Sequence, residues 1–166
     1  FQVHHFRFNL GSKTMLSDVG RTVGDHLGRG GIAVRVLRPT YGAFLRAVYG
    51  RRGLPWRVNG EPLRIDPAVR HLIPQHNEPT LFEFLREGVR PGDLVLDIGA
   101  FLGTYALMEA RWAGERGRVV AFEPTPFSFS ILKRHVRMNG LGAERVDARR
   151  AAVGASCGRS QLMTFD

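Results

Sequence analysis

An aspartate and two glycines at the end of an apolar run are the residues in this chain whose spacing most strongly indicates chemistry. The run Leu94–Ile98 has Asp97 as its one charged residue, and Gly99 and Gly103 follow it. Such a run predicts a parallel strand buried on both faces. Glycines let the backbone approach a ligand, and a helix from Thr104 would direct free N–H groups at it. The pattern predicts a strand, a turn and a helix around a cofactor bearing a carboxylate or a phosphate.

A second carboxylate stands where the next strand is expected to end. Arg118–Phe122 is a further strand-like run, and Glu123 follows it, twenty positions after Gly103. In doubly wound α/β folds an acid at about that distance accepts hydrogen bonds from the ribose of a nucleotide cofactor. We therefore expect Asp97 and Glu123 to serve one pocket.

Phe101 argues against a nicotinamide cofactor. It stands where the dinucleotide fingerprint has its second glycine, and its ring would block a diphosphate. S-adenosylmethionine (SAM) has no diphosphate. Its carboxylate suits the helix N-terminus, its ribose suits Glu123, and its ammonium group suits Asp97 directly or through water. The residues therefore favour SAM.

The order of these motifs resembles one known family. Asp97-Ile98-Gly99-Ala100, Gly103, Tyr105 and Phe122-Glu123-Pro124, followed by Asn139-Gly140-Leu141, resemble the FkbM-type family of SAM-dependent methyltransferases over roughly residues 75–154. The resemblance implies cofactor-binding roles for Asp97, Gly99, Ala100, Phe101, Gly103, Tyr105, Glu123 and Pro124. It also implies that Glu78, in the segment 77–80, faces the cofactor, and that 151–154 is the third strand. We expect Ala151 and Ala152 to leave room for adenine there.

The elements around these motifs predict an α/β fold. We expect a doubly wound, mostly parallel Rossmann-like methyltransferase sheet that is incomplete, with an N-terminal cap made of a helix, a hairpin and a second helix. Residues 1–38 are expected to be a basic tail or a loosely packed segment, 39–90 the cap, and 91–166 a truncated SAM-binding half domain. The family's fourth strand does not appear, so the chain is expected to be an N-terminal portion.

Local signals place the individual elements. Thr40 is expected to cap the first cap helix, the hairpin at 56–65 turns at Asn59-Gly60, and the second cap helix is Pro79–Gly88, packed on the sheet. A helix opening at Pro126 should bury Phe127, Ile131, Leu132 and Val136. The segment 160–165 reads as one more strand.

The histidines offer two candidates for a general base. His71 and His76 precede the second cap helix, where a side chain could overhang the pocket and act near neutral pH. His135 stands beside Arg134 and Arg137 in a run that looks exposed. No spacing indicates a metal site.

Composition leaves the class of acceptor open. The net charge is +9, with 14 basic and 7 acidic residues in positions 1–90. That basic flank keeps a nucleic-acid methyltransferase as one alternative, and a non-catalytic SAM-binding fragment is another. One cysteine, no apolar run long enough for a membrane span and no secretory signal favour a cytoplasmic enzyme. The favoured function is O-methylation of a hydroxyl group on a small molecule or sugar by in-line transfer from SAM.

Overall fold

A computed structural model describes residues 32–156 and 158 of the chain. Contacts divide the chain into two units, 1–43 and 44–166, and helix α2 (Ile32–Tyr49) crosses the boundary between them. Thr40 lies inside α2 and does not cap it, so the predicted helix start is wrong. The helix continues through position 39, although a proline inside a helix removes one backbone hydrogen bond and crowds the carbonyl group four residues earlier. Most of the predicted tail, and the predicted strand at 160–165, lie outside the described residues.

After the end of α2, the second unit continues with the cap hairpin. Strands β1 (Leu54–Val58) and β2 (Glu61–Ile65) pair antiparallel, with Val58 opposite Glu61. The two turn residues, Asn59 and Gly60, both have positive φ, as a type I′ hairpin turn requires. The short 3-10 helix η1 (Pro67–Leu72) and helix α3 (Pro79–Gly88) follow. The predicted hairpin and the predicted helix at Pro79–Gly88 are confirmed.

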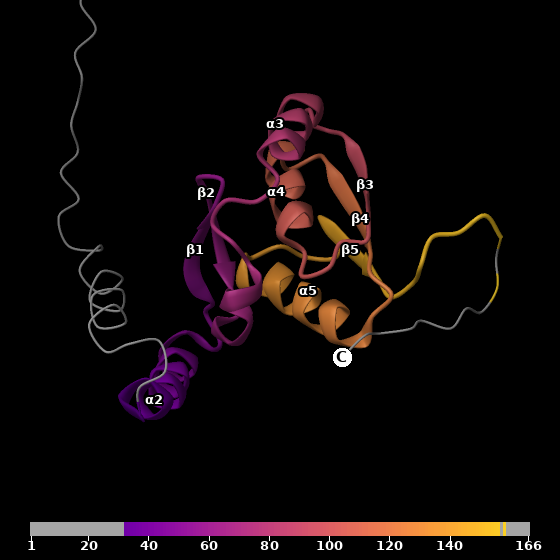
Figure 1. The fold of residues 1–166 in the computed structure, drawn as a ribbon. Coiled ribbons are helices and arrows are strands. Elements are labelled where there is room, and N and C mark those ends of the chain that lie inside the picture. The colour runs from indigo at the N-terminus through magenta and orange to yellow at the C-terminus, as the bar shows by residue number, and fades with distance from the viewer. Residues whose placement is uncertain (1–31, 157, 159–166) are drawn as a thin grey trace, which may run out of the picture. The chain divides into compact units, whose positions relative to one another are not determined.

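A parallel sheet forms the rest of the unit (Figure 1). Its strands are β3 (Leu94–Ile98), β4 (Arg118–Phe122) and β5 (Val146–Arg149), in the order β3-β4-β5. Helices α4 (Thr104–Trp112) and α5 (Pro126–Met138) make the two crossovers. The fold is therefore α/β, with three parallel strands of an incomplete Rossmann-like sheet, as predicted.

The third strand is not where the sequence predicts it. Residues 151–153 are outside any strand, and Ala151 and Ala152 are exposed. The strand is Val146–Arg149, in which only Val146 and Ala148 are apolar. A strand with one exposed face alternates apolar and polar residues, as Val146–Arg149 does, whereas the strand at 151–154 is implied only by the family resemblance.

Only one face of the sheet is covered by described helices. Both crossovers bring their helices to the same side, as right-handed connections between successive neighbouring strands do (Figure 1). Val119, Ala121 and Val146 are buried on that side. Leu94, Leu96 and Ile98 of β3 point the other way and are 60–66% exposed. The prediction that β3 is buried on both faces is therefore wrong.

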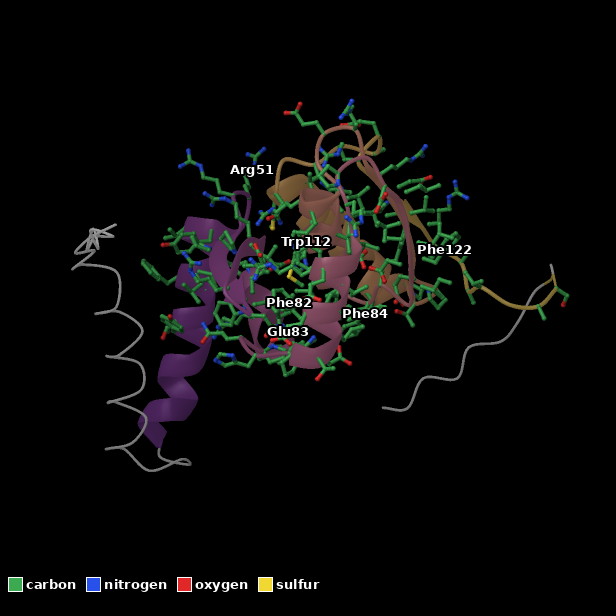
Figure 2. All side chains as sticks on the ribbon, turned by 90° about the horizontal axis from the view of Figure 1, so that it is seen from above. Arg51, Phe82, Glu83, Phe84, Trp112 and Phe122 are labelled. Carbon is green, nitrogen blue, oxygen red and sulfur yellow. The ribbon has the colours of Figure 1, made fainter. Side chains whose placement is uncertain are left out.

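One hydrophobic core joins the cap to the sheet. Val58, Leu63 and Ile65 of the hairpin belong to the same buried cluster as Leu107 of α4 and Leu132 of α5. Figure 2 shows Phe82 of α3 beside Trp112 of α4, and their rings meet edge to face with centroids 5.6 Å apart. Helix α3 therefore packs on α4.

Helix α5 buries most of its predicted apolar stripe. Ile131, Leu132 and Val136 are buried. Phe127 is 57% exposed, so its predicted burial is wrong. It lies in the first turn of α5, where Ser128 is the buried residue instead.

His135 ties three elements together from inside the core. It is fully buried, with Nδ1 2.8 Å from the carbonyl oxygen of Leu102 and Nε2 2.9 Å from the backbone nitrogen of Asp66. Because a backbone N–H can only donate, Nε2 accepts and Nδ1 carries the proton. Burial lowers the pKa of His135, which favours this neutral form. The expectation of an exposed His135 is wrong. It rests on the neighbouring arginines, whereas His135 lies on the buried face of α5 with Ile131 and Leu132.

The side chain of Asp66 extends the same junction. It accepts a hydrogen bond from the N–H of Ala68 at the start of η1 and forms an ion pair with Arg134 of α5. The cap is therefore attached to α5 by a backbone-to-histidine bond and by an ion pair.

Replacing His135 should weaken the whole second unit. We expect His135→Ala to lower the free energy of unfolding by about 3 kcal/mol, because it leaves a cavity and two buried backbone groups without partners. Urea unfolding followed by circular dichroism measures the change. The exposed Arg137→Ala on the same helix is the control and should change stability by less than about 0.5 kcal/mol. Equal losses in the two variants would contradict this account of His135.

Candidate functional site

The turn between β3 and α4 is held against the end of β4 by its own backbone. The N–H groups of Gly99 and Ala100 both donate to the carbonyl oxygen of Phe122, at 2.9 and 3.0 Å. Gly99 and Gly103 both have φ +82°. Phe101 has φ +50°, which is uncommon for a residue with a bulky side chain. The predicted glycine turn is therefore present, and it contains a strained phenylalanine.

Glu123 completes this attachment. Its Oε2 accepts the N–H of Phe101 at 2.9 Å, and its Oε1 accepts the N–H and the hydroxyl of Thr125 at 2.8 and 2.5 Å. The side chain is buried. Glu123 thus fixes both the turn and the residue that precedes α5.

Asp97 lies beside Glu123, at the end of the neighbouring strand. It pairs in register with Ala121, and its Oδ2 is buried without a hydrogen-bond partner among the described residues. Burial raises the pKa of Asp97 to about 6; the Ala106 N–H lowers this pKa and the negative charge of Glu123 raises it. The structure therefore brings the two predicted carboxylates together.

A third carboxylate, Glu109, is part of this group and was missed by the sequence analysis. It is buried in α4, and its Oε2 has no partner among the described residues. Burial and the charge of Asp97 raise the pKa of Glu109 to about 7. The sequence feature that could have indicated its burial is its position between Ala106 and Ala110, two small residues on the helix face turned toward the core.

A cavity of about 360 Å³ lies next to the turn. It is lined by residues of the hairpin, the end of η1, the segment between η1 and α3, the turn after β3 and the start of α4: Val58, Leu72, Ile73, Pro74, Asn77, Glu78, Phe101 and Thr104. Of the predicted site residues, Glu78 and Phe101 line this cavity. Asp97, Gly99 and Glu123 are not among the residues that line it.

The other predicted residues are spread around the turn. Ala100 is buried, Pro124 is half-buried, and Ala151 and Ala152 are exposed beyond the end of β5. The hydroxyl of Tyr105 donates to the carbonyl oxygen of Asn77 at 3.4 Å. Burial, Glu78 and Glu109 raise the pKa of Tyr105. Tyr105 therefore contacts Asn77 of the cavity wall, and the charge of the buried Glu109 reaches its hydroxyl group.

The two histidine candidates do not join this group. His71 and His76 are exposed, and neither lines the cavity. Across the described residues no cluster of three or more histidine, cysteine or acidic side chains could hold a metal ion. In the same part of the chain no helix is long and apolar enough to cross a membrane.

Comparisons with known proteins find similar folds among solved structures. No protein-family model and no curated protein sequence matches the chain. It is similar to a SAM-dependent O-methyltransferase from Thermotoga maritima, with 24% identity over 64% of this chain and 44% of that one, at a TM-score of 0.43.

Two further solved structures are of the same general kind. A SAM-dependent methyltransferase from Aquifex aeolicus is 23% identical over 44% of this chain and 37% of its own, with a TM-score of 0.38. A protein-L-isoaspartate O-methyltransferase is 32% identical over 46% of this chain and 24% of its own, with a TM-score of 0.42. The matched part of this chain spans less than half the length of each of the three.

The two glycines of the turn should differ in how they tolerate alanine. They share the same φ, but an added Cβ meets open space at Gly99 and overlaps Leu132 at Gly103. We expect Gly99→Ala to lower the unfolding free energy by about 1–2 kcal/mol. We expect Gly103→Ala to cost about 1–3 kcal/mol more, since Leu132 is fully buried. Urea unfolding of both variants measures the difference, and equal costs would show that Leu132 does not limit the turn.

The buried carboxyls should make stability depend on pH. Their pKa values are raised in the folded state, so the stability they contribute is complete below about pH 4 and is lost as the pH rises to about 7. Glu109→Gln should flatten this decline and raise the unfolding free energy at pH 8 by an amount on the order of 2 kcal/mol. Urea unfolding at several pH values tests it. The exposed Glu115→Gln is the control, and an unchanged slope in Glu109→Gln would refute the assignment.

Proposed function

We propose that this chain carries the cofactor-binding turn of a SAM-dependent methyltransferase of the FkbM type, which methylates a hydroxyl oxygen of a small molecule or sugar. One observation carries the proposal: the buried oxygen of Asp97 that has no partner among the described residues, at the end of β3 and beside a left-handed glycine turn. An unpaired buried carboxylate oxygen is costly unless a ligand supplies a donor.

The residues present fit SAM. Its ammonium group would pair with the free oxygen of Asp97. Its carboxylate would meet the first N–H groups of α4, at Thr104 and Tyr105, which have no acceptor within the helix. The ribose hydroxyls would donate to Glu123, whose oxygens already accept from Phe101 and Thr125 but have further lone pairs.

When bound, SAM supplies the electrophilic methyl group. The chain's own residues would therefore only bind SAM and orient it toward the acceptor. Gly99 leaves open space at the turn, where a side chain would otherwise stand. Asp97 and Glu109 place negative charge near the end of β3, which favours a cationic ligand. Alignment of methyl group and acceptor then lowers the barrier, and no covalent enzyme intermediate is required.

Removing the charge of Asp97 should weaken SAM binding. We expect Asp97→Asn to raise the dissociation constant for SAM by about 10–100-fold, because one charge-assisted hydrogen bond is lost. Isothermal titration calorimetry on the whole chain measures it. Asp93→Asn is the matched control, since Asp93 is exposed and its side chain accepts the N–H of Arg90. Unchanged affinity in Asp97→Asn, or no SAM binding by the unaltered chain, would refute the proposal.

A further inference from the structure

The cavity between the cap hairpin and the start of α4 is not explained by the cofactor turn. Its volume of about 360 Å³ lies in the range of small-molecule sites. Five of the residues that line it are apolar, and the three polar ones are Asn77, Glu78 and Thr104. The carboxylates assigned above to the cofactor, Asp97 and Glu123, do not line it. The cavity therefore offers a binding surface next to the cofactor turn, with which it shares Phe101 and Thr104.

Two residues in the cavity wall have strained backbones. Glu78 has φ +41° and ψ +63°, and Phe101 has φ +50°. Among the described non-glycine residues the only other positive φ belongs to Asn59, at +48°. Side chains with a Cβ rarely adopt this conformation, and where they do, the strain clusters at ligand sites and active sites. All three such residues lie in this wall or hold it in place.

The wall around Glu78 is held by contacts from separate elements. Asn59 donates through Nδ2 to the carbonyl oxygen of Asn77 at 2.5 Å and accepts the N–H of Asn77 at 2.9 Å. Tyr105 of α4 donates to the same carbonyl group. The N–H of Phe82 donates to the carbonyl oxygen of Glu78 at 2.9 Å. The hairpin, α3 and α4 thus impose the conformation of Glu78.

The carboxylate of Glu78 remains available to a ligand. It is exposed, and its recorded hydrogen bond is a long one, 3.4 Å from Nδ2 of Asn77. A carboxylate accepts hydrogen bonds and repels anions, while the hydroxyl of Thr104 can donate or accept. Val58, Ile73 and Phe101 supply an apolar surface. The chemistry that fits is a neutral molecule with an apolar body and a hydroxyl group.

We propose that this cavity binds the methyl acceptor, a neutral alcohol with an apolar body, and that Glu78 accepts a hydrogen bond from its hydroxyl group. The inference rests on the proposed function, since it takes the ligand to be the acceptor. Phe101 belongs to both the cavity wall and the cofactor turn, so the two ligands would bind side by side.

Benzyl alcohol is a suitable probe for this site. Titrated into the ¹⁵N-labelled chain, it should shift the amide signals of Asn77, Glu78, Phe101 and Thr104. Toluene, which lacks the hydroxyl, and benzoate, which is an anion, should each bind at least about fivefold more weakly. Shifts confined to other residues, or equal binding of benzoate, would overturn the proposal.

A charge-removing variant tests the role of Glu78 itself. We expect Glu78→Gln to weaken benzyl alcohol binding about fivefold and to strengthen benzoate binding, a reversal that loss of structure would not produce. Glu83→Gln, an exposed residue on the helix that follows Glu78, is the matched control and should leave both affinities unchanged. Parallel weakening of both probes in Glu78→Gln would contradict the assignment.

Addition of SAM separates this proposal from the proposed function. At saturating SAM, benzyl alcohol should still shift the cavity amides. If SAM displaces it, the cavity is part of the cofactor site and the acceptor assignment is wrong. If the chain binds no SAM but benzyl alcohol still shifts these amides with the stated selectivity, the proposed function fails while the alcohol site stands.

Discussion

The attachment of the glycine turn to the end of β4 is the interaction on which the rest of the site depends. Parallel strands deliver their carboxyl ends to the same edge of a sheet, so the turn after β3 meets the residues that follow β4. The carbonyl oxygen of Phe122 and the carboxylate of Glu123 together take the N–H groups of Gly99, Ala100 and Phe101. This fixes the backbone of the turn before any ligand is present, which reduces the entropy lost on binding.

A second constraint is the burial of acidic groups without basic partners. Asp97 and Glu109 each have a buried carboxylate oxygen unpaired among the described residues, although the chain as a whole has a net charge of +9. The recorded ion pairs lie away from these carboxylates: Arg134 pairs with Asp66, and Arg118 and Arg149 pair with Asp147. Among the described residues, no recorded ion pair neutralises the carboxylates of the site, and a cationic ligand would relieve the repulsion between them.

The sequence predicted those parts of the fold that local signals determine. The Asn59-Gly60 turn, the proline-initiated helices and β3 and β4 all follow from short-range preferences, and the structure confirms them. What failed depends on packing between distant segments. The exposed face of β3 reflects which side the helices occupy, and the burial of His135 reflects partners at Leu102 and Asp66, far away in the sequence. Glu109 was missed because an acid in an amphipathic helix is ordinarily on its solvent face.

The cap is part of the candidate site because of how it is attached. Val58 lines the cavity and also belongs to the core shared by hairpin and helices, so the cavity wall cannot shift without disturbing that core. The bond from Asp66 to His135, whose other nitrogen donates to Leu102, runs from the cap directly to the turn. Strained residues persist only where their surroundings determine their conformation. The strained conformations of Glu78 and Phe101 therefore depend on both attachments of the cap, the shared core at Val58 and the bonds through His135. Loosening the cap would let both residues relax.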